Sequence, residues 1–178
     1  MTCQDDAKLN TPGLLRLFVY GTLKRGMWNH ERFCAGAVSI EEAVVRGRLY
    51  EMESGLPVLQ VPGADILAYG TADPCADVAT QAHFEAEADQ RPDLRAKGRT
   101  RRGWGLVHGE LITFDDPEDR LPRLDRLEGF HPGGPSFYRR ILLETSCGGN
   151  VIQAWAYAIP FVPRVCRQLV SGIWPECL

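Results

Sequence analysis

Residues 14–26 of the chain read LLRLFVYGTLKRG. Residues 14–20 are mostly apolar and rich in strand formers, so we predict a buried strand there. The strand runs directly into Gly21 and Thr22, where successive backbone N–H groups can form a nest for a carboxylate or an oxyanion because glycine permits unusual dihedral angles. A plain strand-to-helix turn is the alternative. The loop lacks the G-x-x-x-x-G-K-[ST] pattern, so it is not a phosphate loop.

The composition is that of a globular domain. The chain has 178 residues, of which 44% are hydrophobic and 24% charged, and this length favours one domain with a sizeable core. Twenty basic residues against 23 acidic ones give a net charge of -3, which argues against a nucleic-acid partner. No apolar run is long enough to span a membrane.

The amino-terminal residues and the cysteines predict a location. Residues 1–10 are polar and lack the apolar stretch of an export signal. The six cysteines are widely scattered and form no C-x-x-C pair, so we expect free, reduced thiols. We therefore expect a cytoplasmic protein.

Short strands and few helices follow the first strand. Paired glycines in SCGGN predict a hairpin between residues 137–144 and 151–159, whose second strand carries small alanines on one face. The remaining expected elements are a helix over 29–35, strands over 43–52, 56–61 and 104–114, and a helical tail from 163 to 178 built on Val165, Leu169 and Ile173. This pattern predicts an α+β fold with a curved or closed sheet.

Residues 64–103 look like an insertion into this plan. The first half is rich in alanine and acidic residues and predicts a surface helix that begins near Asp77. The second half is basic, with six Lys and Arg residues between positions 91 and 102. We expect this basic half to be a solvated loop that pairs with the acidic half, and we favour this over the alternative that it binds an anionic partner. We assign the insertion no chemistry.

One acidic residue is placed where its pKa can rise. The segment DDPE at 115–118 is a helix start, Pro122 suggests a restart, and Gly129 is a natural helix stop, so Glu128 falls in the final turn. A half-buried carboxylate there can both accept and give a proton near neutral pH. The alternative is a solvated acid that pairs with Arg126 or Arg123.

Other candidate groups are weaker. Glu110 lies beside Gly109 in an otherwise half-buried strand, and it either supports a ligand's ammonium group or faces water. His30, His83, His108 and His131 lack the spacing of a metal triad, so we expect no metal site. A Ser-His-Asp triad lacks its G-x-S-x-G elbow.

Taken together, these segments resemble a known family. FVYGTLKRGMWNH, followed by VHGELITF, LDRLEGF, FYRRILLET and AWAYAI, is similar to the pattern of the gamma-glutamylcyclotransferase-like superfamily, in particular its gamma-glutamylamine cyclotransferase branch. The resemblance covers about residues 15–61 and 104–160. It implies a small mixed β-barrel with peripheral helices, a single domain over 1–178, and a helical tail and long insertion outside the family core.

The resemblance also implies a site. Tyr20, Gly21, Thr22 and Leu23 match the substrate-binding loop, and Glu128 matches the catalytic acid. Tyr138 matches the tyrosine of a Y-x-R pair, with either Arg139 or Arg140 as its arginine, although the link at residues 131–136 is longer and richer in glycine than usual.

The implied reaction needs no cofactor and no metal. The α-amino group of a small-molecule γ-glutamyl amide attacks its own γ-carbonyl, which closes 5-oxoproline and expels the amine. The leaving amine stays open among a polyamine, a lysine side chain, an amino acid and a larger group, including a biosynthetic intermediate from which a γ-glutamyl protecting group is removed. A non-catalytic ligand-binding or interaction module on the same fold is the alternative from another class.

Overall fold

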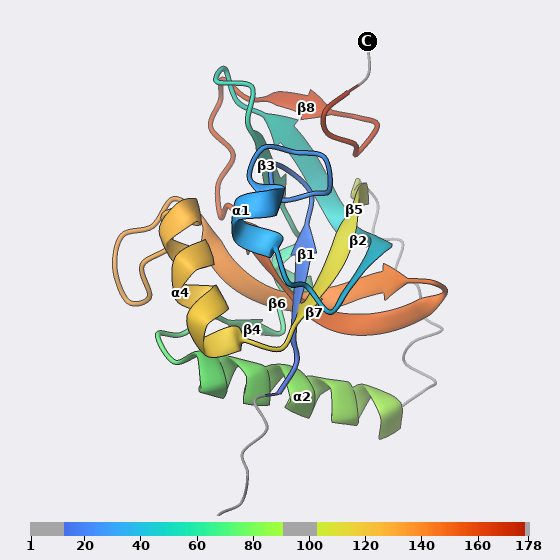
Figure 1. The fold of residues 1–178 in the computed structure, drawn as a ribbon. Helices are drawn as coiled ribbons and strands as arrows, with labels where there is room; N and C mark the ends of the chain where they lie inside the picture. Colours follow the sequence, from blue (N-terminus) through green and yellow to red (C-terminus); the bar gives the residue numbers. More distant parts are fainter. Residues whose placement is uncertain (1–12, 91–102, 177–178) are drawn as a thin grey trace, which may run out of the picture.

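The computed structural model describes residues 13–90 and 103–176, and a closed β-barrel forms its centre (Figure 1). Five strands follow one another around the ring in the order β2, β5, β1, β7 and β6, and β6 returns to β2. Only β1 and β7 run parallel, so the barrel is mixed. The bounds are β1 (Leu15–Val19), β2 (Ser39–Glu51), β5 (Gly105–Phe114), β6 (Arg139–Cys147) and β7 (Asn150–Ala158). This confirms the α+β barrel expected from the sequence.

Two buried clusters occupy the two faces of this barrel. All five strands supply residues to the inner cluster, including Phe18 and the alanines 154, 156 and 158 of β7. The outer cluster holds Leu15, Leu17 and Trp155 together with residues of the helices. The small residues of β7 therefore face the crowded interior, as their spacing predicted.

The hairpin between β6 and β7 turns where the paired glycines lie. Gly148 and Gly149 both have positive φ, at 56° and 83°, which suits the two-residue turns that match the twist of antiparallel strands. The register pairs Cys147 with Asn150 and continues to Arg139 with Ala158.

Three short strands extend the barrel. β3 (Pro57–Gln60) and β8 (Arg167–Leu169) flank the end of β2, and β4 (Ala68–Tyr69) pairs with β6. The prediction of a helical tail was therefore wrong. Leu169 is buried in β8, but Val165 and Ile173 are 63% and 45% exposed, so the helical stripe that they suggested has no surface to cover.

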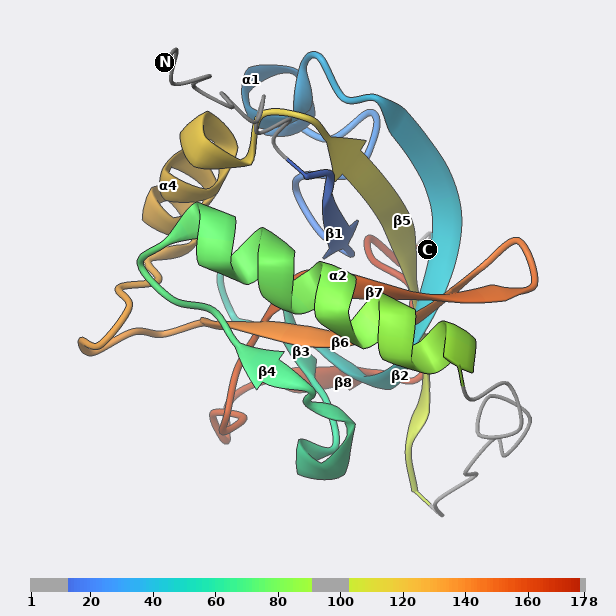
Figure 2. The ribbon, with the colours of Figure 1, turned by 90° about the horizontal axis from the view of Figure 1, so that it is seen from below.

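Helices cover the outer face. They are α1 (His30–Cys34), α2 (Pro74–Gln90) and α4 (Pro117–Glu128), with a 3-10 turn η1 (Gly63–Asp65). Figure 2 shows α2 lying across one side of the barrel, where it contacts β7 and α4. The helix predicted near Asp77 is confirmed and begins at Pro74, whereas the basic residues between 91 and 102 lie outside the described residues.

The helix α4 is continuous, so the predicted restart at Pro122 was wrong. Pro122 is exposed in the second turn, where its missing N–H removes one hydrogen bond without ending the helix. Gly129 ends the helix in the left-handed conformation, as predicted, with φ of 63°. In the described parts of the chain, no helix combines the length and apolar character needed to cross a bilayer.

Candidate active site

A pocket of about 370 Å³ lies where β1 and β7 end. Because these two strands are parallel, their carboxyl ends meet at the same edge of the barrel. The lining comes from segments that are far apart in the chain: Phe18, Val19, Tyr20, Gly21, Thr22, Leu23, Trp28, Asn29, Met52, Leu56, Pro57, Leu127, Glu128, Phe137, Tyr138 and Tyr157. The structure thus brings the predicted loop, Glu128 and Tyr138 together around one cavity.

The loop after β1 is folded back on itself. Asn29 donates from its backbone to the carbonyl of Thr22 at 3.2 Å and from its side chain to the Thr22 hydroxyl at 3.0 Å. Lys24 donates from its backbone to the carbonyl of Gly21 at 3.1 Å. Within residues 13–90 and 103–176, no group accepts a hydrogen bond from the backbone N–H of Gly21, Thr22 or Leu23. The three residues line the pocket, and their N–H groups have no acceptor among the described residues.

Glycine is needed at position 21 for a different reason from the one expected. Gly21 does not adopt positive φ, in contrast to Gly26 later in the loop, so unusual dihedral angles are not its role. A Cβ atom at Gly21 would lie 2.7 Å from Cγ of Pro57, which also lines the pocket. The close approach of the loop to β3 therefore requires the missing side chain.

Glu128 is the last residue of α4 and projects into this pocket. The alternative of a solvated acid paired with Arg126 or Arg123 does not hold. In the part of the chain that the structure describes, the Glu128 carboxylate accepts no hydrogen bond and forms no ion pair. Arg123 donates instead to the carbonyl of Arg32 at 3.1 Å. Burial raises the pKa of Glu128 to about 7, so both protonation states are accessible near neutral pH.

The Tyr20 hydroxyl is already engaged by the backbone. It donates to the carbonyl of Tyr157 at 2.8 Å and accepts from the N–H of Leu59 at 3.3 Å. Burial, followed by the neighbouring Tyr138 and Glu128, raises the pKa of Tyr20 well above its usual value. Tyr20 therefore holds three strands together at the pocket and stays neutral.

Tyr138 reaches the pocket despite the long link before it. The link closes on itself, since Ser136 accepts at 2.7 Å from the N–H of His131 and donates at 3.1 Å to the same residue's carbonyl. The Tyr138 hydroxyl donates to the carbonyl of Pro57 at 3.1 Å. Burial, followed by Glu128, raises the pKa of Tyr138.

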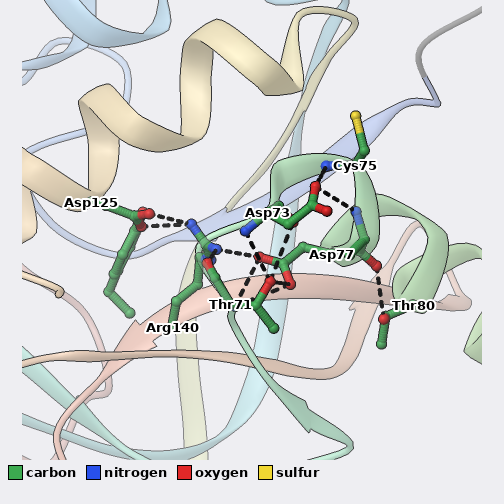
Figure 3. Close-up of polar contacts among 9 residues, drawn as sticks. Thr71, Asp73, Cys75, Asp77, Thr80, Asp125 and Arg140 are labelled. Carbon is green, nitrogen blue, oxygen red and sulfur yellow. Dashed lines mark hydrogen bonds and ion pairs between the residues drawn. The ribbon is translucent and has the colours of Figure 1, made fainter. Parts of the chain in front are cut away.

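Tyr157, which the sequence did not single out, joins the pocket to a buried charge network. Its hydroxyl donates at 2.6 Å to Asp125, and Asp125 accepts at 2.6 Å from Arg140. Arg140 also pairs with Asp77 of α2 and donates to the carbonyl of Thr71 at 2.8 Å (Figure 3). Of the two arginines that matched the family pattern, Arg140 is the one in this network, whereas Arg139 is exposed against Tyr69.

Glu110 does not line the pocket. Its carboxylate accepts from both the backbone N–H and the side chain of Arg25, at 2.8 and 2.7 Å. Glu110 therefore anchors the far side of the loop after β1. Elsewhere in the described residues, no three His, Cys, Asp or Glu side chains gather as a metal site.

Four other lining residues were not singled out by the sequence, although Trp28 and Phe137 lie within segments that resemble the family. Trp28, Met52, Leu56 and Phe137 are apolar residues in loops, and their pattern does not differ from that of ordinary surface residues. Only the closure of the barrel places them around one opening.

Comparison with known proteins identifies the class of this chain. The sequence model of the family described as gamma-glutamyl cyclotransferase, AIG2-like, matches residues 17–72 and 75–176. The chain belongs to this family. No curated protein matches the chain, and the gamma-glutamylamine cyclotransferase branch remains a prediction.

Solved structures show the same fold at low sequence identity. An uncharacterized protein, PH0828, from Pyrococcus horikoshii is 20% identical with a TM-score of 0.51, and the match covers 90% of this chain and 89% of that one. An AIG2-like protein from Mus musculus is 22% identical with a TM-score of 0.50, covering 86% and 82%. YkqA from Bacillus subtilis is 18% identical with a TM-score of 0.52, and the match covers 90% of this chain but spans only 39% of YkqA.

Proposed function

We propose that the protein is a γ-glutamyl cyclotransferase that converts a small-molecule γ-glutamyl amide into 5-oxoproline and a free amine. The observation that carries this proposal is the position of Glu128. Within residues 13–90 and 103–176 its carboxyl group has no partner, and it shares a pocket with three residues whose backbone N–H groups are unused there. Membership of the family supports the same chemistry.

The proposed reaction needs one group that accepts a proton from the attacking nitrogen and donates a proton to the leaving nitrogen. The Glu128 carboxylate takes a proton from the α-ammonium group of the substrate, and the freed amine attacks the γ-carbonyl carbon. A C–N bond forms to close the five-membered ring, and the bond from the γ-carbon to the leaving nitrogen breaks. As the carbonyl re-forms, Glu128 gives its proton to the leaving nitrogen, so a pKa of about 7 suits both steps. The ring nitrogen loses its second proton to water, and the released amine takes up one proton from water to become an ammonium ion.

The pocket supplies orientation as well as proton transfer. Nucleophile and carbonyl belong to one molecule, and a well-oriented intramolecular reaction reaches effective molarities of about 10⁵ M or more. The N–H groups of Gly21, Thr22 and Leu23 provide donors for the substrate carboxylate or for the oxyanion that develops during attack.

The test is release of 5-oxoproline from γ-glutamyl amides by the wild type and by Glu128→Gln. The substitution keeps the shape and removes the base, so we expect turnover to fall at least about a hundredfold. Glu118→Gln, an exposed acid on the same helix, is the matched control and keeps wild-type turnover. Unchanged turnover in a folded Glu128→Gln protein would exclude the assignment, and absence of turnover in the wild type would favour a binding module.

A further inference from the structure

The pocket changes character between its floor and its mouth. The floor comes from the ends of β1, β7 and α4 and from the first residues of the loop after β1. It holds the buried Tyr20 and Tyr157, Glu128, and the loop residues whose N–H groups have no acceptor among the described residues. The mouth is built by loops and is apolar. Three of its side chains are substantially exposed, namely Trp28 (65%), Phe137 (48%) and Leu56 (37%), and Met52 lies beside them.

The two aromatic rings at the mouth have fixed supports. Trp28 packs edge-on against the buried Trp174, with ring centroids 5.8 Å apart. Phe137 packs edge-on against Tyr138 at 4.9 Å. Each ring therefore has one supported edge and a remaining surface in contact with solvent, which an apolar ligand group can cover.

The described part of the chain places no charge at this mouth that would complement a charged leaving group. Among the described residues that line the pocket, Glu128 alone is charged, and the reaction uses it. The two cations of the loop after β1 are held elsewhere, since Lys24 donates to the carbonyl of Trp174 and Arg25 pairs with Glu110. Glu53, in the turn between Met52 and Leu56, does not line the pocket.

From this arrangement we propose that the leaving amine is uncharged beyond its reacting nitrogen and is apolar, with an aromatic group the best fit. This rests on the proposed function and names its substrate class. A carboxylate on the leaving group, as in a γ-glutamyl amino acid, would lose water at an apolar mouth without gaining a cation. A second ammonium group, as in a polyamine or a lysine, would gain only the weak attraction of exposed rings.

Matched substrates test this directly. The n-pentylamide and the putrescine amide of γ-glutamate have nearly the same shape and differ by one terminal charge, and the phenethylamide and γ-glutamylphenylalanine differ by one carboxylate. We expect kcat/KM to be about tenfold or more higher for the neutral member of each pair. Equal or higher values for the charged members would overturn the inference.

Variants locate the preference at the mouth. Trp28→Ala and Phe137→Ala are expected to lower kcat/KM for the phenethylamide about fivefold while that for γ-glutamyl methylamide changes less than about twofold. Trp28→Phe, which keeps a ring, is expected to recover most of the kcat/KM that Trp28→Ala loses. Phe161→Ala is the control: it removes an aromatic ring that is 82% exposed and outside the pocket, and it should leave kcat/KM unchanged. Equal losses on both substrates would contradict the assignment of these rings to the leaving group.

The outcome separates the two proposals. Turnover of the methylamide without a preference for apolar amides overturns only this inference. Turnover of no amide, together with no calorimetric binding of the phenethylamide to Glu128→Gln, overturns both.

Discussion

The hydroxyl of Tyr20 donates to the backbone carbonyl of Tyr157 at 2.8 Å, so the loop that leaves β1 is tied to the end of the parallel strand β7. The same oxygen accepts the N–H of Leu59 in β3. A residue that the sequence marked for the substrate thus uses its polar atom to hold the pocket's framework.

Replacing Tyr20 with Phe therefore affects stability. The variant leaves a buried carbonyl and a buried N–H without their partner, which costs about 1–3 kcal/mol in the free energy of unfolding. Urea denaturation measures this loss, and Tyr69→Phe, which alters an exposed tyrosine, should lie within about 0.5 kcal/mol of the wild type. A Tyr20→Phe protein as stable as the wild type would show that the two backbone groups find other partners.

The pH dependence of turnover should follow Glu128. Because the proposed reaction begins with the carboxylate form, kcat/KM for a γ-glutamyl amide should rise with pH and level off above an inflection near pH 7. The residual activity of Glu128→Gln should lack that inflection. A wild-type profile that is flat between pH 5 and 9, or an inflection kept by the variant, would assign the proton transfer to another group.

The same pKa shift makes a prediction about stability. The pKa of Glu128 is about 7 in the folded protein and near 4.5 when unperturbed, so the folded state binds more protons between these values. Its contribution to stability is complete below about pH 4.5 and is lost as the pH rises through 7. Relative to Glu128→Gln, the wild type should lose about 3 kcal/mol across this window, as measured by denaturation at a series of pH values. An unchanged difference would mean that the carboxyl is well solvated.

The buried pair of Asp77 and Arg140 should be costly to break. Both side chains are 1% exposed, and Asp77→Ala leaves the Arg140 guanidinium with one carboxylate in place of two. We expect a loss of about 3–5 kcal/mol in the free energy of unfolding. Glu176→Ala, which breaks an exposed pair with Arg167, should cost far less, because water screens that pair. Similar small losses for both variants would show that Arg140 is satisfied without α2.

A methyl group at Gly21 should damage the pocket more than the fold. The Cβ of Gly21→Ala meets Pro57 at 2.7 Å, so either the loop or β3 must shift at the pocket wall. We expect kcat/KM to fall about tenfold or more, because a displacement of about 1 Å at a reacting centre carries a large penalty. Gly63→Ala, where a Cβ meets nothing within 4 Å, is the control and keeps full activity.

Most of the fold could be predicted from local sequence patterns. Alternation in β7 and the paired glycines of the hairpin are short-range signals, and they gave the correct strands and turn. The prediction of a helical tail failed because Leu169 is buried by pairing with Leu49 of β2. No hydrophobic periodicity within the tail reveals this contact. The prediction missed the continuity of α4 for the opposite reason. Pro122 is a strong local signal for a helix start, and tertiary packing overrides it.

The candidate site was only partly predictable. The sequence shows that Glu128 comes just before a helix-ending glycine. It does not show that Arg123 donates to the carbonyl of Arg32, which leaves the Glu128 carboxylate without a partner among the described residues. Tyr157 and the mouth residues could not be singled out, because their role arises from the closure of the barrel. Glu110 looked like a ligand group, whereas its carboxylate binds Arg25.

The division of the pocket into a buried floor and an exposed, apolar mouth bears on how the substrate of such a protein can change. Trp28, Met52, Leu56 and Phe137 belong to none of the strands or helices. If the proposed function holds, natural variation at these four positions would change which amine is accepted without changing a residue of a strand or helix. Selection for a new substrate would then act on residues that pair no barrel strands, so specificity could change while the strand register is kept.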